Sequence, residues 1–154
     1  MIRHSPAPVL ERLRSIRDRS VDLVAPLEPE DLMLQGMADA SPPKWHLAHT
    51  TWFFDTFLLQ PNRPNWQPTP ECWGVLFNSY YEAVGARHPR PLRGLLSRPA
   101  IADVLAWRHR VDTGLETLLQ EPSEGVTTLV ELGLQHEQQH QELLLMDLLD
   151  GFQR

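Results

Sequence analysis

A polar interruption in an otherwise leucine-rich helix constrains this chain most. The stretch "LQHEQQHQELLLM", residues 134 to 146, places two histidines four residues apart among leucines. At about 100° per residue, one narrow helical stripe contains Leu129, Leu132, His136, His140, Leu143 and Asp147. Both imidazoles therefore point where the leucines point, into the core, where a polar group without a partner is costly.

A shared metal ion would explain this pair, because imidazoles at i and i+4 lie on one helix face. A single buried histidine is more often a hydrogen-bonded core residue than a ligand, so a third ligand decides the question. In "KWHLAHTTWFFDTFLL", the neighbours of His49 on its helix face are Trp45, Trp52 and Phe53, three or four positions away, and Thr56, seven positions away. His49 therefore faces the core and is the predicted third ligand. His46 lies toward the edge of that face and is expected at the boundary or behind the ligands.

Three neutral histidines from two facing helices would leave open positions on the metal, which is typical of a catalytic site rather than a closed structural one. Three nitrogen ligands suit zinc, iron or nickel, and affinity order alone does not discriminate among them. Glu142, two residues after His140, is expected to orient an imidazole as a hydrogen-bond acceptor. The alternative for Glu142 is an exposed helix acid.

Helical periodicity dominates the chain and predicts an all-α four-helix bundle. The expected helices span about residues 8–25, 42–60, 98–121 and 123–150. Ser41, followed by two prolines, and Ser123 are the expected helix caps.

Residues 61–97 form the long connection between the second and third helices, and their Pro, Arg and Gly content predicts an irregular loop with at most one helical turn. An ordered connection of this length is usually functional.

Length and charge bound the remaining possibilities. The 154 residues suffice for one domain, residues 1–154, with a sizeable core. A net charge of -6 without a basic stripe argues against nucleic acid as a partner. No stretch approaches the ~20 apolar residues of a membrane span, and the single cysteine argues against a disulfide-built secreted fold. We expect a cytoplasmic protein.

The letters "HEQQH" also satisfy the zinc-protease pattern H-E-x-x-H, in which the glutamate is the general base. The extended form of that pattern requires a Gly and a third His at fixed spacing after the second His. The following residues, "QELLLMDLLDG", contain no His, and their Gly is not at the required position. A protease is therefore the weaker interpretation.

Three separated motifs carry a resemblance to a known family. "SPPKWHLAHTTWFFDTFLL", "FNSYYEAVGARHPRPLRGLLSRP" and "HEQQHQE" resemble the N-terminal DinB-like domain of ergothioneine-pathway sulfoxide synthases of the EgtB type. The resemblance covers about residues 8–150. It implies a DinB-type four-helix bundle that holds non-haem iron(II) through His49, His136 and His140, the same three histidines that the helix faces select.

The resemblance also implies a reaction and its substrate contacts. Such enzymes use dioxygen to join the sulfur of γ-glutamylcysteine or cysteine to the imidazole of hercynine, giving a sulfoxide. Gln139, about 60° from His136 on the helix, matches a residue expected to contact the substrate imidazole. Arg87 and Arg90 match the segment whose arginines receive the carboxylate of the thiol, a task that suits the guanidinium fork. The alternative for both is solvated loop charges.

The family's synthases carry a C-terminal domain that completes the pocket, and this sequence ends at "LLDGFQR" before any of it. We therefore expect a metal-binding chain that needs that domain in cis or in trans, with exposed aromatics among Trp52, Trp66, Trp73 and Tyr80 and a tendency to form homo-oligomers. The alternatives are a DinB-type thiol transferase using zinc or nickel, and a non-catalytic helical bundle.

Overall fold

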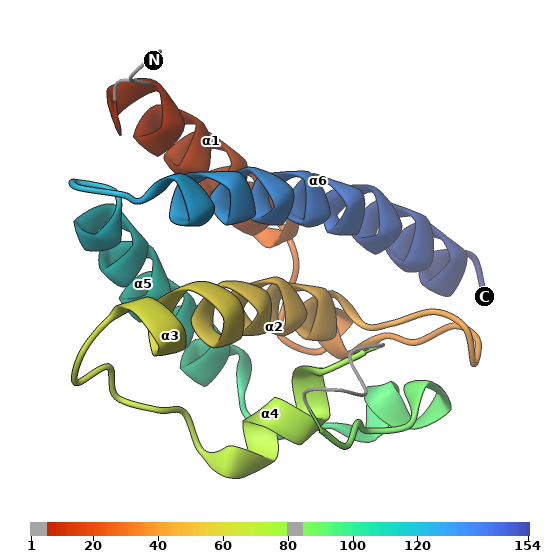
Figure 1. Cartoon of the computed structure of the whole chain (residues 1–154). Coiled ribbons are helices and arrows are strands. Elements are labelled where there is room, and N and C mark those ends of the chain that lie inside the picture. Colours follow the sequence, from red (N-terminus) through yellow and green to blue (C-terminus); the bar gives the residue numbers. More distant parts are fainter. Residues whose placement is uncertain (1–5, 80–84) are drawn as a thin grey trace.

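The computed structural model describes residues 6–79 and 85–154, and all regular structure in these two ranges is helical (Figure 1). Four long helices form the bundle: α1 (Pro6–Val24), α2 (Pro43–Phe54), α5 (Ile101–Leu118) and α6 (Glu124–Gln153). The predicted all-α bundle is confirmed, and each of these helices begins within three residues of its expected start.

The second helix is longer than α2 alone. A π-helical segment, Asp55–Leu59, and then α3 (Gln60–Asn62) follow α2 without a break, so helical structure extends from 43 to 62. Asp55 is buried in this segment and accepts hydrogen bonds from the indole N–H groups of Trp107 (2.7 Å) and Trp66 (3.0 Å). These bonds attach the start of the long connection and the middle of α5 to the end of α2.

The connection 61–97 is more ordered than predicted. It contains a two-turn helix, α4 (Glu71–Phe77), and a 3₁₀ helix at Arg90–Leu95, with a further short 3₁₀ helix at Asp31–Met33 earlier in the chain. Trp73 and Phe77 of α4 pack on the Trp107 ring of α5, with centroid distances of 5.1 and 5.9 Å. Tertiary packing of aromatic rings thus stabilises a helix in a segment whose Pro and Gly content predicts an irregular loop.

Helix α2 is the central element of the bundle. All twelve of its residues are buried, and it packs against α1, α5, α6 and α4 (Figure 1). Because α2 is covered on every side, its polar side chains need partners, and Lys44, Thr50 and Thr51 donate hydrogen bonds to backbone carbonyl oxygens. The expectation of exposed aromatics is wrong for Trp52, which is 2% exposed; Trp66 and Trp73 are half-buried, and Tyr80 lies outside the described residues.

Gly133 sets the close approach of α6 to α2. A Cβ atom at this position would lie 2.5 Å from Cε1 of Phe54, so a larger residue would push the two helices apart. Because His136 follows Gly133 by one helical turn, the same close approach brings the histidines of α6 within reach of α2.

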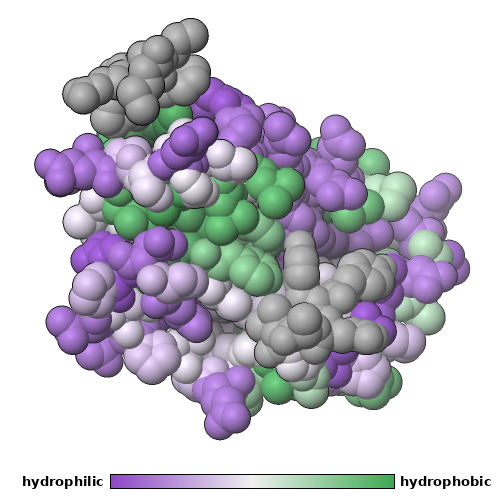
Figure 2. All heavy atoms as spheres, viewed as in Figure 1, coloured by the Kyte–Doolittle hydropathy of each residue, from purple (hydrophilic) through white to green (hydrophobic). Residues whose placement is uncertain are grey.

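The outer surface of α6 is only partly polar. Its exposed apolar residues are Leu132, Leu145, Met146, Leu149 and Phe152. On the face shown in Figure 2, apolar side chains gather along the first half of α6 and beside α2, with hydrophilic side chains around them. Among residues 6–79 and 85–154, no helix combines the length and the apolar character needed to cross a bilayer.

Candidate metal centre

The structure brings His49 of α2 together with His136 and His140 of α6. Each offers one ring nitrogen, and these three nitrogens all lie within 4.8 Å of one another. The Nε2 atoms of His49 and His136 are 3.1 Å apart. Two nitrogens that each bind one metal at about 2.1 Å would be separated by about 3.0 to 3.4 Å. The histidine set therefore fits a single ion of the zinc, iron or nickel type.

His49 is held rigidly. Its Nδ1 donates a hydrogen bond of 2.6 Å to the carbonyl oxygen of Phe77, the last residue of α4. Its ring stacks on the indole of Trp45, with centroids 4.6 Å apart and an interplanar angle of 10°. Trp45 in turn donates from Nε1 to the carbonyl oxygen of Leu76 at 3.0 Å. Because Nδ1 is occupied as a donor, Nε2 of His49 is the atom whose lone pair is available to a metal ion.

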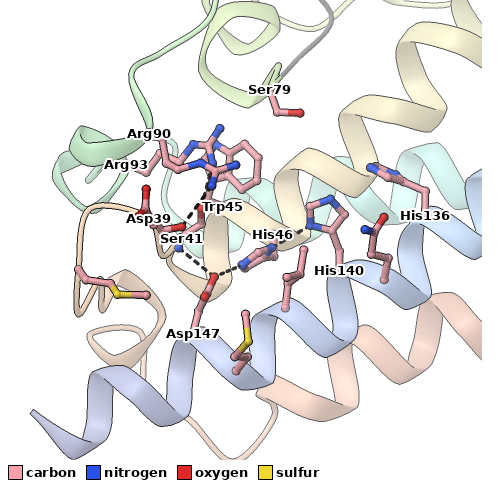
Figure 3. A pocket seen from close by; sticks show the side chains of 14 residues that line it. Asp39, Ser41, Trp45, His46, Ser79, Arg90, Arg93, His136, His140 and Asp147 are labelled. Atoms are coloured by element: carbon pink, nitrogen blue, oxygen red, sulfur yellow. Dashed lines mark hydrogen bonds and ion pairs between the residues drawn. The ribbon is translucent and has the colours of Figure 1, made fainter.

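His140 is oriented by a chain of two further residues (Figure 3). Its Nδ1 lies 2.9 Å from Nδ1 of His46, and Nε2 of His46 lies 2.9 Å from Oδ2 of Asp147. The same Oδ2 accepts the backbone N–H of Ser41 at 2.9 Å. His46 and Asp147 are both buried, so this chain runs inside the protein from α6 to α2 and back to α6.

His136 is the least constrained of the three. Its ring lies 4.7 Å from that of Phe53. Its Nδ1 is buried and has no hydrogen-bond partner among the described residues. A half-buried imidazole with an unused ring nitrogen is a poor packing residue and a suitable ligand.

All four histidines are held in the neutral form. Burial lowers the pKa of His46, His49, His136 and His140, and neighbouring imidazoles lower the pKa of His49 and His140 further. Neutral imidazole is the form that binds a metal, so no proton has to be removed before the site can load.

His46, His136 and His140 line a cavity of about 600 Å³ between α2, α6 and the 3₁₀ helix at Arg90–Leu95, and His49 is buried behind them. Figure 3 shows the imidazoles of His46 and His140 on one side and the guanidinium groups of Arg90 and Arg93 on the other. Arg93 is buried, donates to Oγ of Ser41 at 2.9 Å and stacks 3.5 Å above the Trp45 ring. The cavity thus combines a histidine centre with fixed positive charge.

The predicted substrate residues occupy different places. Gln139 and Arg90 line the cavity, Gln139 with an exposed side chain and Arg90 half-buried. Arg87 is exposed and does not line the cavity, but it donates a hydrogen bond of 2.6 Å to the carbonyl oxygen of Ser79, which does. Glu142 is exposed and does not line the cavity, which contradicts its predicted orienting role. It lies about 200° around the helix from His140.

Sequence reasoning placed His46 at the boundary or behind the ligands but did not identify its partners, and it missed the roles of Asp147 and Arg93. Asp147 carried a signal, since it falls on the histidine stripe seven residues after His140. Arg93 carried none, because its place depends on the path of the connection.

The glutamate of "HEQQH" does not line the cavity. Glu137 is fully buried and binds both Arg17, at 3.0 Å, and Arg108, while Ser20 donates to it at 2.5 Å. Burial alone would raise its pKa, but the two guanidinium charges outweigh that effect and lower the pKa to about 2. A carboxylate fixed between two arginines cannot act as general base at the histidines, which rejects the protease interpretation.

A helical bundle with three converging histidines, opening onto a charged cavity, defines a class of metal-binding helical proteins. The chain belongs to the DinB superfamily, whose sequence model matches residues 12–144, and proteins of this superfamily in general bind metals. No curated protein matches the chain.

Proposed function

We propose that this chain is the iron(II)-binding domain of a cytoplasmic non-haem sulfoxide synthase that joins γ-glutamylcysteine or cysteine to hercynine in ergothioneine biosynthesis. The observation that carries this proposal is the convergence of three neutral imidazoles beside a cavity: His136 and His140 lie in its wall with His49 buried behind them, and Arg90 and Arg93 also line it. The resemblance of the three sequence motifs supports the choice of reaction.

The ligand set supports catalysis rather than a structural role. His49, His136 and His140 would hold the ion from one side, and the cavity leaves the remaining positions accessible. Iron(II), when bound, supplies the dioxygen and redox chemistry that side chains lack.

The cavity also suits substrates that carry carboxylates. Arg90 and Arg93 present guanidinium groups to its interior, where reduced solvent access strengthens a charged hydrogen bond. Gln139 lies beside His136 and His140 along the cavity and can exchange hydrogen bonds with a substrate imidazole. The hercynine and thiol substrates both match this pattern, and Arg87 would act from the rim.

The synthases that the motifs resemble complete this pocket with a second domain that supplies a catalytic tyrosine. We propose that the chain acts with such a domain, in cis or in trans. The cavity borders the exposed apolar surface of α6 at Met146, which suits burial under a partner.

An anaerobic iron(II) titration tests the metal centre. Bound iron and thermal stability would be followed for the wild type, His49→Ala and His136→Ala, with His109→Ala as control because His109 is exposed on α5. We expect one iron per chain in the wild type and the control, and loss of binding in the two variants that lack a ligand histidine. Iron binding that ignores His49 would overturn the assignment.

A second experiment tests the reaction. The iron-loaded chain, mixed with the second domain of a synthase, would receive hercynine, the thiol and dioxygen. Oxygen consumption that requires both substrates, with a sulfoxide product, supports the proposal. A zinc- or nickel-loaded chain that transfers the thiol without oxygen would instead identify a thiol transferase.

A further inference from the structure

We propose that Asp147 and His46 are positioning residues that fix the tautomer and orientation of His140 and thereby present its Nε2 lone pair to the metal. This inference deepens the proposed function and rests on its three-histidine centre. It concerns side chains that do not themselves belong to the ligand set.

The direction of the hydrogen bonds follows from chemistry at the end of the chain. Oδ2 of Asp147 already accepts the Ser41 N–H, and an ionised carboxylate can only accept. Nε2 of His46, 2.9 Å from Oδ2, must therefore carry the proton. A neutral imidazole has one N–H, so Nδ1 of His46 is left as an acceptor.

The next bond in the chain is determined by the first. Nδ1 of His140 lies 2.9 Å from the bare Nδ1 of His46, so His140 must be the donor. Its own Nε2 is then unprotonated. The carboxylate of Asp147 thus sets, through two imidazoles, which nitrogen of His140 is available as a ligand.

Sequence spacing makes this arrangement possible. Asp147 and His140 are seven residues apart on α6, two turns along one face, and His46 enters between them from α2. His46 is 4% exposed and Asp147 8% exposed, so water competes little for these bonds. His46 is engaged at both ring nitrogens, which leaves it no lone pair for the ion.

The three ligands are consequently supported to different degrees. His49 donates to a backbone carbonyl, His140 donates to His46, and Nδ1 of His136 has no partner among the described residues. Within residues 6–79 and 85–154, only His140 is oriented by a carboxylate, so metal binding by His140 should depend on a side chain that can be removed without touching a ligand.

The first test needs no variant. Nitrogen NMR of metal-free, ¹⁵N-histidine-labelled wild type would report which ring nitrogen of each histidine is protonated. We expect protonated Nε2 in His46 and protonated Nδ1 in His140. The opposite tautomer in either residue would overturn the inference. This readout is independent of iron, oxygen and activity, so it still decides the inference if the proposed reaction fails.

The second test measures zinc(II) affinity by competition with a chelator, with folding monitored by circular dichroism. Asp147→Asn and His46→Leu are expected to weaken zinc binding about 10- to 100-fold. Asp150→Asn, one turn further along α6, is the matched control and should bind as the wild type does. His46→Asn keeps an acceptor oxygen near the Nδ1 position and should recover part of the loss seen in His46→Leu.

Equal zinc affinity in the wild type, Asp147→Asn and His46→Leu would overturn the inference. Weak binding by all chains, the wild type included, would contradict the proposed metal centre, and the tautomers would then decide the inference alone.

Discussion

Two buried polar clusters share helix α6 and differ in every respect that matters for function. Around Glu137, the charges of Arg17 and Arg108 face two carboxylates, those of Glu137 and Asp112, so the cluster compensates itself. Around His140, neutral imidazoles face a cavity, and one ring nitrogen of His136 has no partner among the described residues. One cluster is closed and the other is open.

The contrast shows how adjacent residues in one helix can take opposite roles. His136 and Glu137 are neighbours in the sequence, but their side chains leave the helix about 100° apart. The Glu137 side meets α1 and α5, which supply arginines, and the His136 side meets α2 and the cavity. Charge balance identifies the first cluster as structural, whereas neutral imidazoles that converge beside a cavity identify the second as a binding site.

Lowering the pH should act first on the histidine cluster and should cause the largest loss in the free energy of unfolding. A histidine whose folded pKa lies below its unfolded value binds a proton in the unfolded chain only, so stability is lost as pH falls below about 6.5. This applies to His46, His49, His136 and His140. Each histidine that stays neutral in the folded protein lowers the free energy of unfolding by about 2 kcal/mol between pH 7 and pH 5.

Urea unfolding of the metal-free protein across this pH range measures the effect. His140→Gln should flatten the pH dependence, and His109→Gln, at an exposed position, should leave it unchanged. Identical slopes in the wild type and His140→Gln would contradict the neutral state of the cluster.

Removing Glu137 tests the closed cluster. Among the described residues, Glu137→Gln leaves Arg17 and Arg108 with the Asp112 carboxylate alone, and we expect the free energy of unfolding to fall by about 3 to 5 kcal/mol. Below about pH 4.5 the difference should shrink, because the lowered pKa of Glu137 contributes stability that is lost as pH falls toward about 2.

The matched control is Glu131→Gln. Glu131 also pairs with an arginine of α1, Arg12, at 2.6 Å, but on the surface, where such a pair contributes at most about 1 kcal/mol. Similar losses in the two variants would mean that burial does not distinguish the clusters.

Removing a ligand from the open cluster should have the smallest effect on the metal-free protein. His136→Gln is expected to change its unfolding free energy by less than about 1 kcal/mol, since the ring is half-buried and makes few hydrogen bonds. Zinc at 100 times its Kd should raise the free energy of unfolding of the wild type by about 2.7 kcal/mol and should leave that of the variant unchanged. A large loss without metal, seen in thermal unfolding, would make His136 a packing residue.

Sequence patterns predicted most of the fold because four segments keep a helical period. They did not predict α4 or the 3₁₀ helix at Arg90–Leu95, since Trp73 and Phe77 are helical there through contacts with Trp107, far away in sequence. The π-helical turn at Asp55–Leu59 likewise depends on tertiary hydrogen bonds to Trp66 and Trp107.

For the site, the spacing of His136 and His140 and the neighbours of His49 were sufficient to select the three residues that converge. The pairing of His46 with Asp147 was out of reach, because it requires the register of α2 against α6, which no single-helix pattern contains. The orienting role predicted for Glu142 failed for the opposite reason: its angle on the helix already pointed it away.

The hydrogen bonds from Trp45 and His49 to the carbonyls of Leu76 and Phe77 make α4 part of the centre. A helix of seven residues is not stable by itself in water, so α4 is ordered only while it is docked. Any ligand that fixes His49 must therefore slow the exchange of α4 amide protons with solvent. Hydrogen exchange of α4, which contains none of the three histidines, should therefore report whether a metal ion is bound to them.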